Sequence, residues 1–227
     1  VVAYFAMALL FGGFTTAEQK RLVLIFFLFI GAALFWSGFE QAGSALNLFA
    51  ADYTDRVIFG WEAPASWLQS INPIFIIIFA PIFGWLWLAL GKWNPSLPFK
   101  FGYGLILLGL GFLVVAWAAT YATPTEGVSP MWLVVTYFLH TSGELCLSPI
   151  GLSSITKLSP KKLVGQMMGI WFMGASLGNL IAGFAAAQME NMPLPKLFGS
   201  VAAIVIGSGV LFVIFKGPIR RLQGGVE

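Results

Sequence analysis

Residues 22–40 read LVLIFFLFIGAALFWSGFE, an unbroken apolar run that ends in a carboxylate. The hydrocarbon core of a bilayer is about 30 Å thick, and about 20 helical residues cross it. Apolar runs of this size lie at residues 22–50, 68–90, 99–121, 131–156, 163–187 and 197–215. Each run is continuous, whereas the strands of a membrane β-barrel alternate between apolar and polar residues. We therefore expect an all-α membrane protein with six transmembrane helices.

The composition agrees with a protein surrounded by lipid. Hydrophobic residues make up 59% of the 227 residues and charged residues only 9%, against roughly 25% charged residues in ordinary soluble domains. The formal net charge of +3 does not indicate a nucleic-acid-binding protein, because the basic residues are scattered in short runs between apolar stretches. The lone cysteine, Cys146, lies inside an apolar run and predicts no disulfide framework.

The chain opens at Val1 inside apolar sequence, without the basic segment and small-residue cleavage site of a signal peptide. We expect residues 1–14 to be the end of a preceding transmembrane helix. Residues 15–221 would then form the six-helix bundle, and residues 222–227 a cytoplasmic tail.

Local signals predict where helices begin and where they are interrupted. Thr15 with Glu18, and Ser66 with Gln69, have the spacing of a capping box at a helix start. A proline within a helix frees a backbone carbonyl and kinks or breaks the helix. Such interruptions are predicted at Asn72-Pro73 and at Ser148-Pro149, whereas a packing kink is favoured at Pro81.

The lysines and arginines predict the orientation in the membrane. Ten of the twelve precede the first span, follow the sixth, or lie between the second and third or the fourth and fifth spans. Only Arg56 and Lys196 lie in the other loops. Because cytoplasmic loops carry an excess of lysine and arginine, both ends of the six-helix unit are expected in the cytoplasm. We expect a multi-pass protein of the cell membrane, in bacteria the inner membrane.

Two acids lie within the spans: Glu40 in the first and Glu144 in the fourth. On insertion scales each costs about 3 kcal/mol at the centre of a membrane helix, so such residues usually face a bundle interior or a water-filled cavity. The alternative is a protonated structural carboxyl that is hydrogen-bonded inside the bundle. No lysine or arginine of the chain lies at the same depth. The counter-charges must therefore be protons, a cationic group of a substrate, or basic residues on another segment.

At i and i+4 spacing each acid shares a helix face with two neighbours: Trp36 and Ser44 for Glu40, and His140 and Ser148 for Glu144. His140 either relays protons or is a neutral histidine packed between helices, and the second interpretation is favoured. In the fifth span, Trp171 either lines a pocket or packs among glycines that allow close helix contacts.

Four stretches resemble the proton-dependent oligopeptide transporter family of the major facilitator superfamily: Phe35-Trp36-Ser37-Gly38-Phe39-Glu40-Gln41; Ser66-Trp67-Leu68-Gln69 with Asn72-Pro73; Gly143-Glu144-Leu145-Cys146-Leu147-Ser148-Pro149-Ile150-Gly151-Leu152; and Gly165 to Gly169 through Trp171-Phe172 to Gly178-Asn179. The resemblance implies the C-terminal half of a twelve-helix core, built as two inverted three-helix repeats. The first helix of each triplet carries one of the two acids. Residues 1–14 would be the end of an extra helix that bacterial members insert between the halves.

The resemblance also implies a function: proton-coupled symport of di- and tripeptides by alternating access, without enzymatic activity. Glu144 would receive the peptide ammonium group, and Glu40 and Glu144 would couple transport to protons. Protons would be the coupling ion, with no other cofactor and no metal. The partners would be the peptide, the bilayer and the N-terminal six-helix half. The residues implied to bind substrate are Trp36, Asn72, Glu144, Ser148, Trp171 and Phe172.

Three alternatives stay open at this point. One is a related transporter of nitrate or another small solute, against which the amine-binding role of Glu144 argues. Another is a channel or a non-transporting membrane subunit. The last is an intramembrane enzyme that uses Glu40 and Glu144 as an acid/base pair, although no nucleophile or metal-ligand cluster accompanies them.

Overall fold

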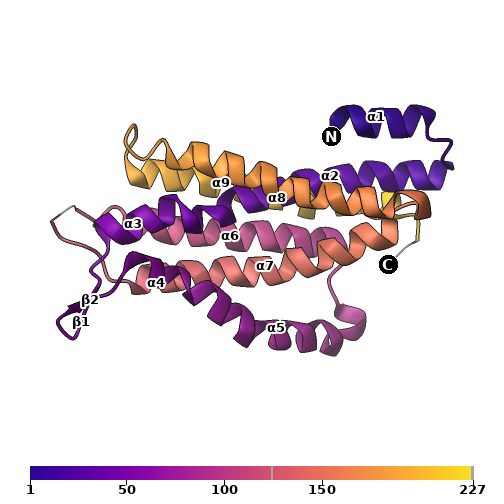
Figure 1. Cartoon of the computed structure of the whole chain (residues 1–227). Coiled ribbons are helices and arrows are strands. Elements are labelled where there is room, and N and C mark those ends of the chain that lie inside the picture. The colour runs from indigo at the N-terminus through magenta and orange to yellow at the C-terminus, as the bar shows by residue number, and fades with distance from the viewer. Residues whose placement is uncertain (124, 226–227) are drawn as a thin grey trace.

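The computed structural model describes residues 1–123 and 125–225, and residues 226–227 of the expected tail lie outside them. It shows a bundle of long helices that run side by side, with the N-terminal helix folded back at one end and α5 leaning away from the others (Figure 1). The helices are α1 (Val2–Phe11), α2 (Thr16–Phe39), α3 (Ala45–Tyr53), α4 (Ala65–Gln69), α5 (Ile71–Ala89), α6 (Leu97–Ala118), α7 (Met131–Leu158), α8 (Val164–Ala186), α9 (Leu194–Ile214) and α10 (Lys216–Gln223). Three short 3-10 turns cover Glu40–Gly43, Gly91–Trp93 and Lys161–Leu163, and two short strands form a hairpin, β1 (Val57–Ile58) and β2 (Trp61–Glu62).

The expected all-α membrane fold is confirmed. Within the described chain, five segments are long and apolar enough to cross a membrane: Thr16–Tyr53, Ala65–Ala89, Leu97–Ala118, Lys161–Ala186 and Leu194–Ile214. The remaining expected span forms α7, which is long enough at 28 residues. Polar residues such as His140 and Glu144 lower its mean hydropathy. A helix packed among other helices tolerates such residues because it is shielded from lipid.

The centre of the bundle is α6, which packs along α9 on one side and α7 on the other. Each contact includes a point where glycines bring the two backbones close together. A β-carbon added to Gly104 would lie 2.9 Å from the carbonyl oxygen of Gly143, and one added to Gly209 would lie 2.7 Å from that of Gly102. Small residues of this kind allow membrane helices to approach closely.

A second close contact joins α2 to α8. A β-carbon added to Gly178 would lie 2.6 Å from Cβ of Trp36 and 2.7 Å from the backbone nitrogen of Ser37. Since Trp36 precedes Glu40 by one turn, this contact fixes the helix that leads into the first membrane acid.

The first span is interrupted at this acid. α2 ends at Phe39, a 3-10 turn covers Glu40–Gly43, and α3 begins at Ala45. A 3-10 turn has 3.0 residues per turn instead of 3.6. The expected common face of Trp36, Glu40 and Ser44 assumed a continuous α-helix, so it does not hold beyond Glu40.

The prolines interrupt the helices less than the sequence predicts. Pro149 lies inside α7, which continues on both sides, so the predicted break there is wrong. Pro81 also lies inside a helix that continues on both sides, α5, and the packing kink favoured there needs no break. Pro73 lies in the first turn of α5, where a missing N–H costs little, and the chain is interrupted just before it at Ser70.

Of the two predicted capping boxes, that of Thr15 and Glu18 is present. The box at Ser66 is wrong because α4 already begins at Ala65, after Pro64.

Two attachments complete the fold. α1 lies along α2, with Phe5 edge-on to Phe26 and the Tyr4 hydroxyl donating to the side chain of Gln166 on α8. At the other end, Asp55 and Tyr53 exchange backbone hydrogen bonds of 2.9 Å with Val128, which tie the segment after α3 to the loop before α7.

α5 is held almost entirely by α7. None of its residues, all within the described part of the chain, is buried. The side-chain amide of Asn72 donates to the hydroxyl of Thr141 over 2.8 Å, and Phe79 packs edge-on against Phe138. Asn72 therefore reaches the face of α7 that carries Glu144.

We predict that Thr141→Val weakens the α5–α7 contact in the intact protein. Thr141 is fully buried, and interhelical hydrogen bonds in membranes contribute about 0.6 kcal/mol on average and at most about 1.7. The free energy of unfolding should therefore fall by about 1 kcal/mol, measured in detergent. Asn72→Ala combined with Thr141→Val should cost less than the two single changes added together; strict additivity would show that the bond contributes nothing.

We also predict that Gly178→Ala destabilises the α2–α8 contact. The added methyl group would push against backbone atoms of α2, and overpacking typically costs about 1–3 kcal/mol. Gly174→Ala is the matched control on the same helix, because its β-carbon would meet nothing closer than 3.4 Å. Thermal unfolding should separate the two variants. Equal melting temperatures would contradict the close contact.

Candidate substrate and proton site

The structure brings the two membrane acids together. Glu40 lies in the 3-10 turn after α2 and Glu144 in the middle of α7, and both side chains are half-buried. They are close enough for the carboxylates to interact electrostatically. Neither forms an ion pair with a lysine or arginine of the described residues. The bundle thus holds two neighbouring acids without a counter-charge of its own.

One carboxylate oxygen of Glu144, Oε2, is buried and has no hydrogen-bond partner among residues 1–123 and 125–225. Buried polar atoms are nearly always paired, and an unpaired one calls for an explanation. A structural carboxyl would be expected to bond to its neighbours. The unpaired oxygen therefore favours a group that binds something from outside this bundle.

The segment around the break holds more atoms of this kind. Nε1 of Trp36, Oε1 of Gln41, Oγ of Ser44 and Oδ1 of Asn47 are all buried without a hydrogen-bond partner in the described chain. Gln41 and Asn47 were not among the residues predicted for the site. Their position could have indicated them, because both are polar amides inside an otherwise apolar span.

The α7 face around Glu144 gathers further predicted residues. Ser148 lies one turn after Glu144 and is half-buried. Thr141 lies three residues before Glu144, hence on the same side of the helix, and binds Asn72 of α5. Asn72 of α5 thus contacts the α7 face that carries Glu144 and Ser148. Thr141, which makes this contact, was not among the residues predicted for the site.

The two predicted aromatic residues of α8 lie in different environments. Trp171 is 3% exposed, with its ring against Gly151 of α7 and edge-on to Phe101 of α6. Phe172, the next residue, is 59% exposed. This burial favours packing for Trp171, whereas Phe172 is available to a ligand.

The position of His140 also favours a role in packing between helices. Its side chain is 1% exposed and its ring lies 4.9 Å from that of Phe112. Within the described residues, no group of histidine, cysteine, aspartate or glutamate is arranged to hold a metal ion.

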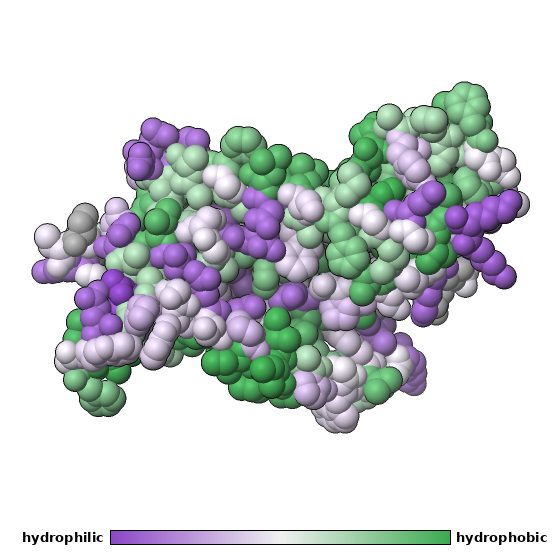
Figure 2. Space-filling view, viewed as in Figure 1, coloured by the Kyte–Doolittle hydropathy of each residue, from purple (hydrophilic) through white to green (hydrophobic). Residues whose placement is uncertain are grey.

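Apolar and hydrophilic residues are distributed over the surface as expected for a membrane bundle with a polar side. Figure 2 shows apolar surface over α1 and α5, and hydrophilic surface gathered at the two ends of the bundle. Further hydrophilic patches cross the middle of this face between the ends.

Comparison with known proteins identifies the family of the chain. Residues 5–201 match the family PTR2, the POT family. The chain is 44% identical over 235 residues to the peptide transporter YePEPT of Yersinia enterocolitica, covering 100% of this chain and 46% of that protein. It is 31% identical over 230 residues to a di-/tripeptide transporter of Lactococcus lactis, again covering 100% of this chain and 46% of that protein.

A crystal structure of a peptide transporter POT in complex with sulfate superimposes with a TM-score of 0.90 at 34% identity, covering 97% of this chain and 45% of that one. The chain thus spans about half the length of the proteins it resembles. The family match extends over most of the chain, and the relatives it resembles are named as transporters. The chain belongs to the POT family of membrane transporters.

Proposed function

We propose that the whole transporter, of which this chain forms one half, carries di- and tripeptides together with protons by alternating access. The observation that carries the proposal is the buried, unpaired carboxylate oxygen of Glu144 beside Glu40. The names of the relatives support the substrate class, since they are peptide and di-/tripeptide transporters.

Glu144 is proposed to accept the terminal ammonium group of the peptide, with Ser148 beside it. A cation neutralises a buried carboxylate, and a proton does the same when no peptide is bound. Two neighbouring acids repel each other when both are charged, so protonation of Glu40 would favour the charged form of Glu144, the form that binds an ammonium group. Trp36, Asn72 and Phe172 would form walls of the pocket, and Trp171 would hold α8 in place.

The partner in this proposal is the N-terminal six-helix half. The carboxylate of a peptide needs basic groups, and no lysine or arginine of the described residues forms an ion pair with Glu40 or Glu144. The other half would supply them and cover the exposed side of α5 and of α8 at Phe172.

The proposed orientation places both ends of the six-helix unit in the cytoplasm. Lys92, Lys157 and Arg220 come from three separate segments and line one pocket at one end of the bundle. Gathering cations at one end agrees with the excess of lysine and arginine in cytoplasmic loops. The membrane would be the bacterial inner membrane, because the named relatives are bacterial proteins.

We predict that Glu144→Gln strongly reduces gradient-driven peptide uptake. The full-length transporter would be reconstituted in liposomes, and uptake of a labelled dipeptide would be measured with and without an inward proton gradient. Loss of a charged hydrogen bond to the ammonium, worth about 1.5–3 kcal/mol, should lower apparent affinity about 10- to 100-fold. Glu190→Gln, an exposed loop acid, is the control and should leave uptake unchanged.

Each other outcome of this uptake measurement has a distinct meaning. No gradient-driven uptake of any small peptide by the unaltered transporter would overturn the peptide assignment in favour of another small solute. Normal uptake by Glu144→Gln would leave Glu144 a structural residue.

The orientation predicts opposite labelling of two introduced cysteines. Cys146 is buried, and Cys146→Ala removes any background labelling of this cysteine by the maleimide. A membrane-impermeant maleimide added to spheroplasts should label Phe59→Cys, in the exposed β1–β2 turn, and spare Lys162→Cys until the membrane is permeabilised. The reverse order would show that the ends of the unit lie outside.

A further inference from the structure

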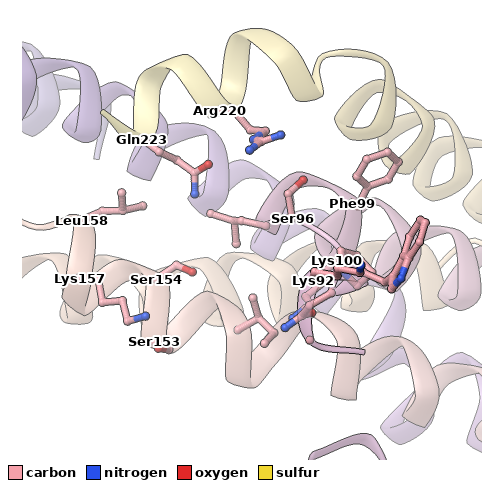
Figure 3. A pocket seen from close by; sticks show the side chains of 16 residues that line it. Lys92, Ser96, Phe99, Lys100, Ser153, Ser154, Lys157, Leu158, Arg220 and Gln223 are labelled. Carbon is pink, nitrogen blue, oxygen red and sulfur yellow. The ribbon is translucent and has the colours of Figure 1, made fainter. Parts of the chain in front are cut away.

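A cavity of about 730 Å³ lies at the proposed cytoplasmic end of the bundle. It is formed where the turn between α5 and α6 meets the last turns of α7 and α10 (Figure 3). Its volume falls within the roughly 300–1,000 Å³ of small-molecule pockets. It is separate from the site around Glu40 and Glu144, and neither acid lines it.

Within the described chain, the charged residues that line this cavity are all basic. No aspartate or glutamate is among its described lining residues. Figure 3 shows Arg220 projecting from α10 toward the space that Lys157 and Lys92 approach from the opposite wall. The cations that line it are Lys92, Lys100, Lys157 and Arg220.

Among the cations that line the cavity, Lys100 has the most unusual environment. It is only 6% exposed, and its ammonium lies over the ring of Trp87, 4.4 Å from the ring centre. It forms no ion pair with any carboxylate of the described chain. A cation–π contact stabilises an ammonium but leaves its positive charge in place. A buried charge is normally paired, so an anion bound at this wall of the cavity would be stabilised by Lys100.

The neutral groups of the cavity are also donors. Ser96 is the N-cap of α6, yet its hydroxyl makes no capping hydrogen bond within the described residues. The Ser96 hydroxyl therefore stays available to a ligand at the start of this 22-residue helix. The hydroxyls of Ser153 and Ser154 lie on the facing wall.

The remaining wall is apolar. Leu97, Phe99 and Leu158 line the cavity beside the charged groups. The cavity thus offers cations and hydroxyls to an oxyanion and an apolar surface to whatever the oxyanion carries. Basic pockets between membrane helices on the cytoplasmic side bind anionic lipid headgroups by this combination.

We infer that this cavity binds a phosphate oxyanion, either the headgroup of an anionic phospholipid or inorganic phosphate. The inference rests on Lys92 and on the buried Lys100, which both line the cavity. It does not depend on the peptide assignment, so the two can fail separately.

The test uses the purified full-length transporter. Binding of phosphatidylglycerol is titrated by native mass spectrometry, with zwitterionic phosphatidylcholine as the reference lipid. In a second arm, sodium phosphate is compared with sodium chloride at equal ionic strength for its effect on the melting temperature. Lys92→Gln should weaken binding about fivefold, since each lysine near an anionic surface contributes about 1 kcal/mol.

Lys20→Gln is the matched control, because Lys20 is exposed and lines neither this cavity nor the smaller one beside α1. Lys100→Met tests the buried cation, and Lys92→Gln keeps the test decisive if that variant unfolds. Selective phosphatidylglycerol binding that Lys92→Gln weakens identifies a lipid site. Selective stabilisation by phosphate that Lys92→Gln removes identifies a phosphate site. Binding of neither ligand above its reference, or equal weakening by Lys20→Gln, would overturn the inference.

Discussion

The bundle depends on glycines at the points where α6 comes closest to its two main neighbours. In lipid, helices gain little from burying apolar surface against one another, so close van der Waals packing has to hold them together. Gly104 and Gly143 let α6 and α7 touch backbone to backbone, and Gly102 with Gly209 does the same for α6 and α9. Gly143 directly precedes Glu144. The contact that joins the helices therefore also sets the depth and rotation of the acid in the proposed site.

This packing explains how a polar helix can cross the membrane. α7 carries His140, Thr141, Glu144 and Ser148 along its length, and it is shielded by α6, α2, α5 and α8. The buried hydroxyl of Thr141 is satisfied by Asn72. The oxygen of Glu144 that stays unpaired lies near the one place where the first span leaves the α-helical path. A break and an unpaired acid in the same region are typical of binding sites in membrane transporters, where irregular backbone lines a cavity.

The sequence predicted the helices and the intramembrane acids because both follow from local rules: a continuous apolar run is a span, and a charge within one is rare. The meeting of Glu40 and Glu144 could be anticipated only from the resemblance, since they are far apart in the chain. The effect of Pro149 could not be predicted, because whether a helix continues through a proline depends on its neighbours. The same holds for Trp171 and Phe172. Adjacent residues of one helix point about 100° apart, and only the positions of α6 and α7 decide which of the two is buried.

The two backbone bonds of Val128 have a consequence for movement. They fasten the end of the first span to the loop that leads into the second three-helix repeat, at the rim opposite the basic cavity. Any motion that pulled α3 away from the start of α7 would have to break both bonds at once. The fastened rim therefore favours a half that tilts as one solid piece, with any internal flexing placed deeper, where the 3-10 turn replaces the helix.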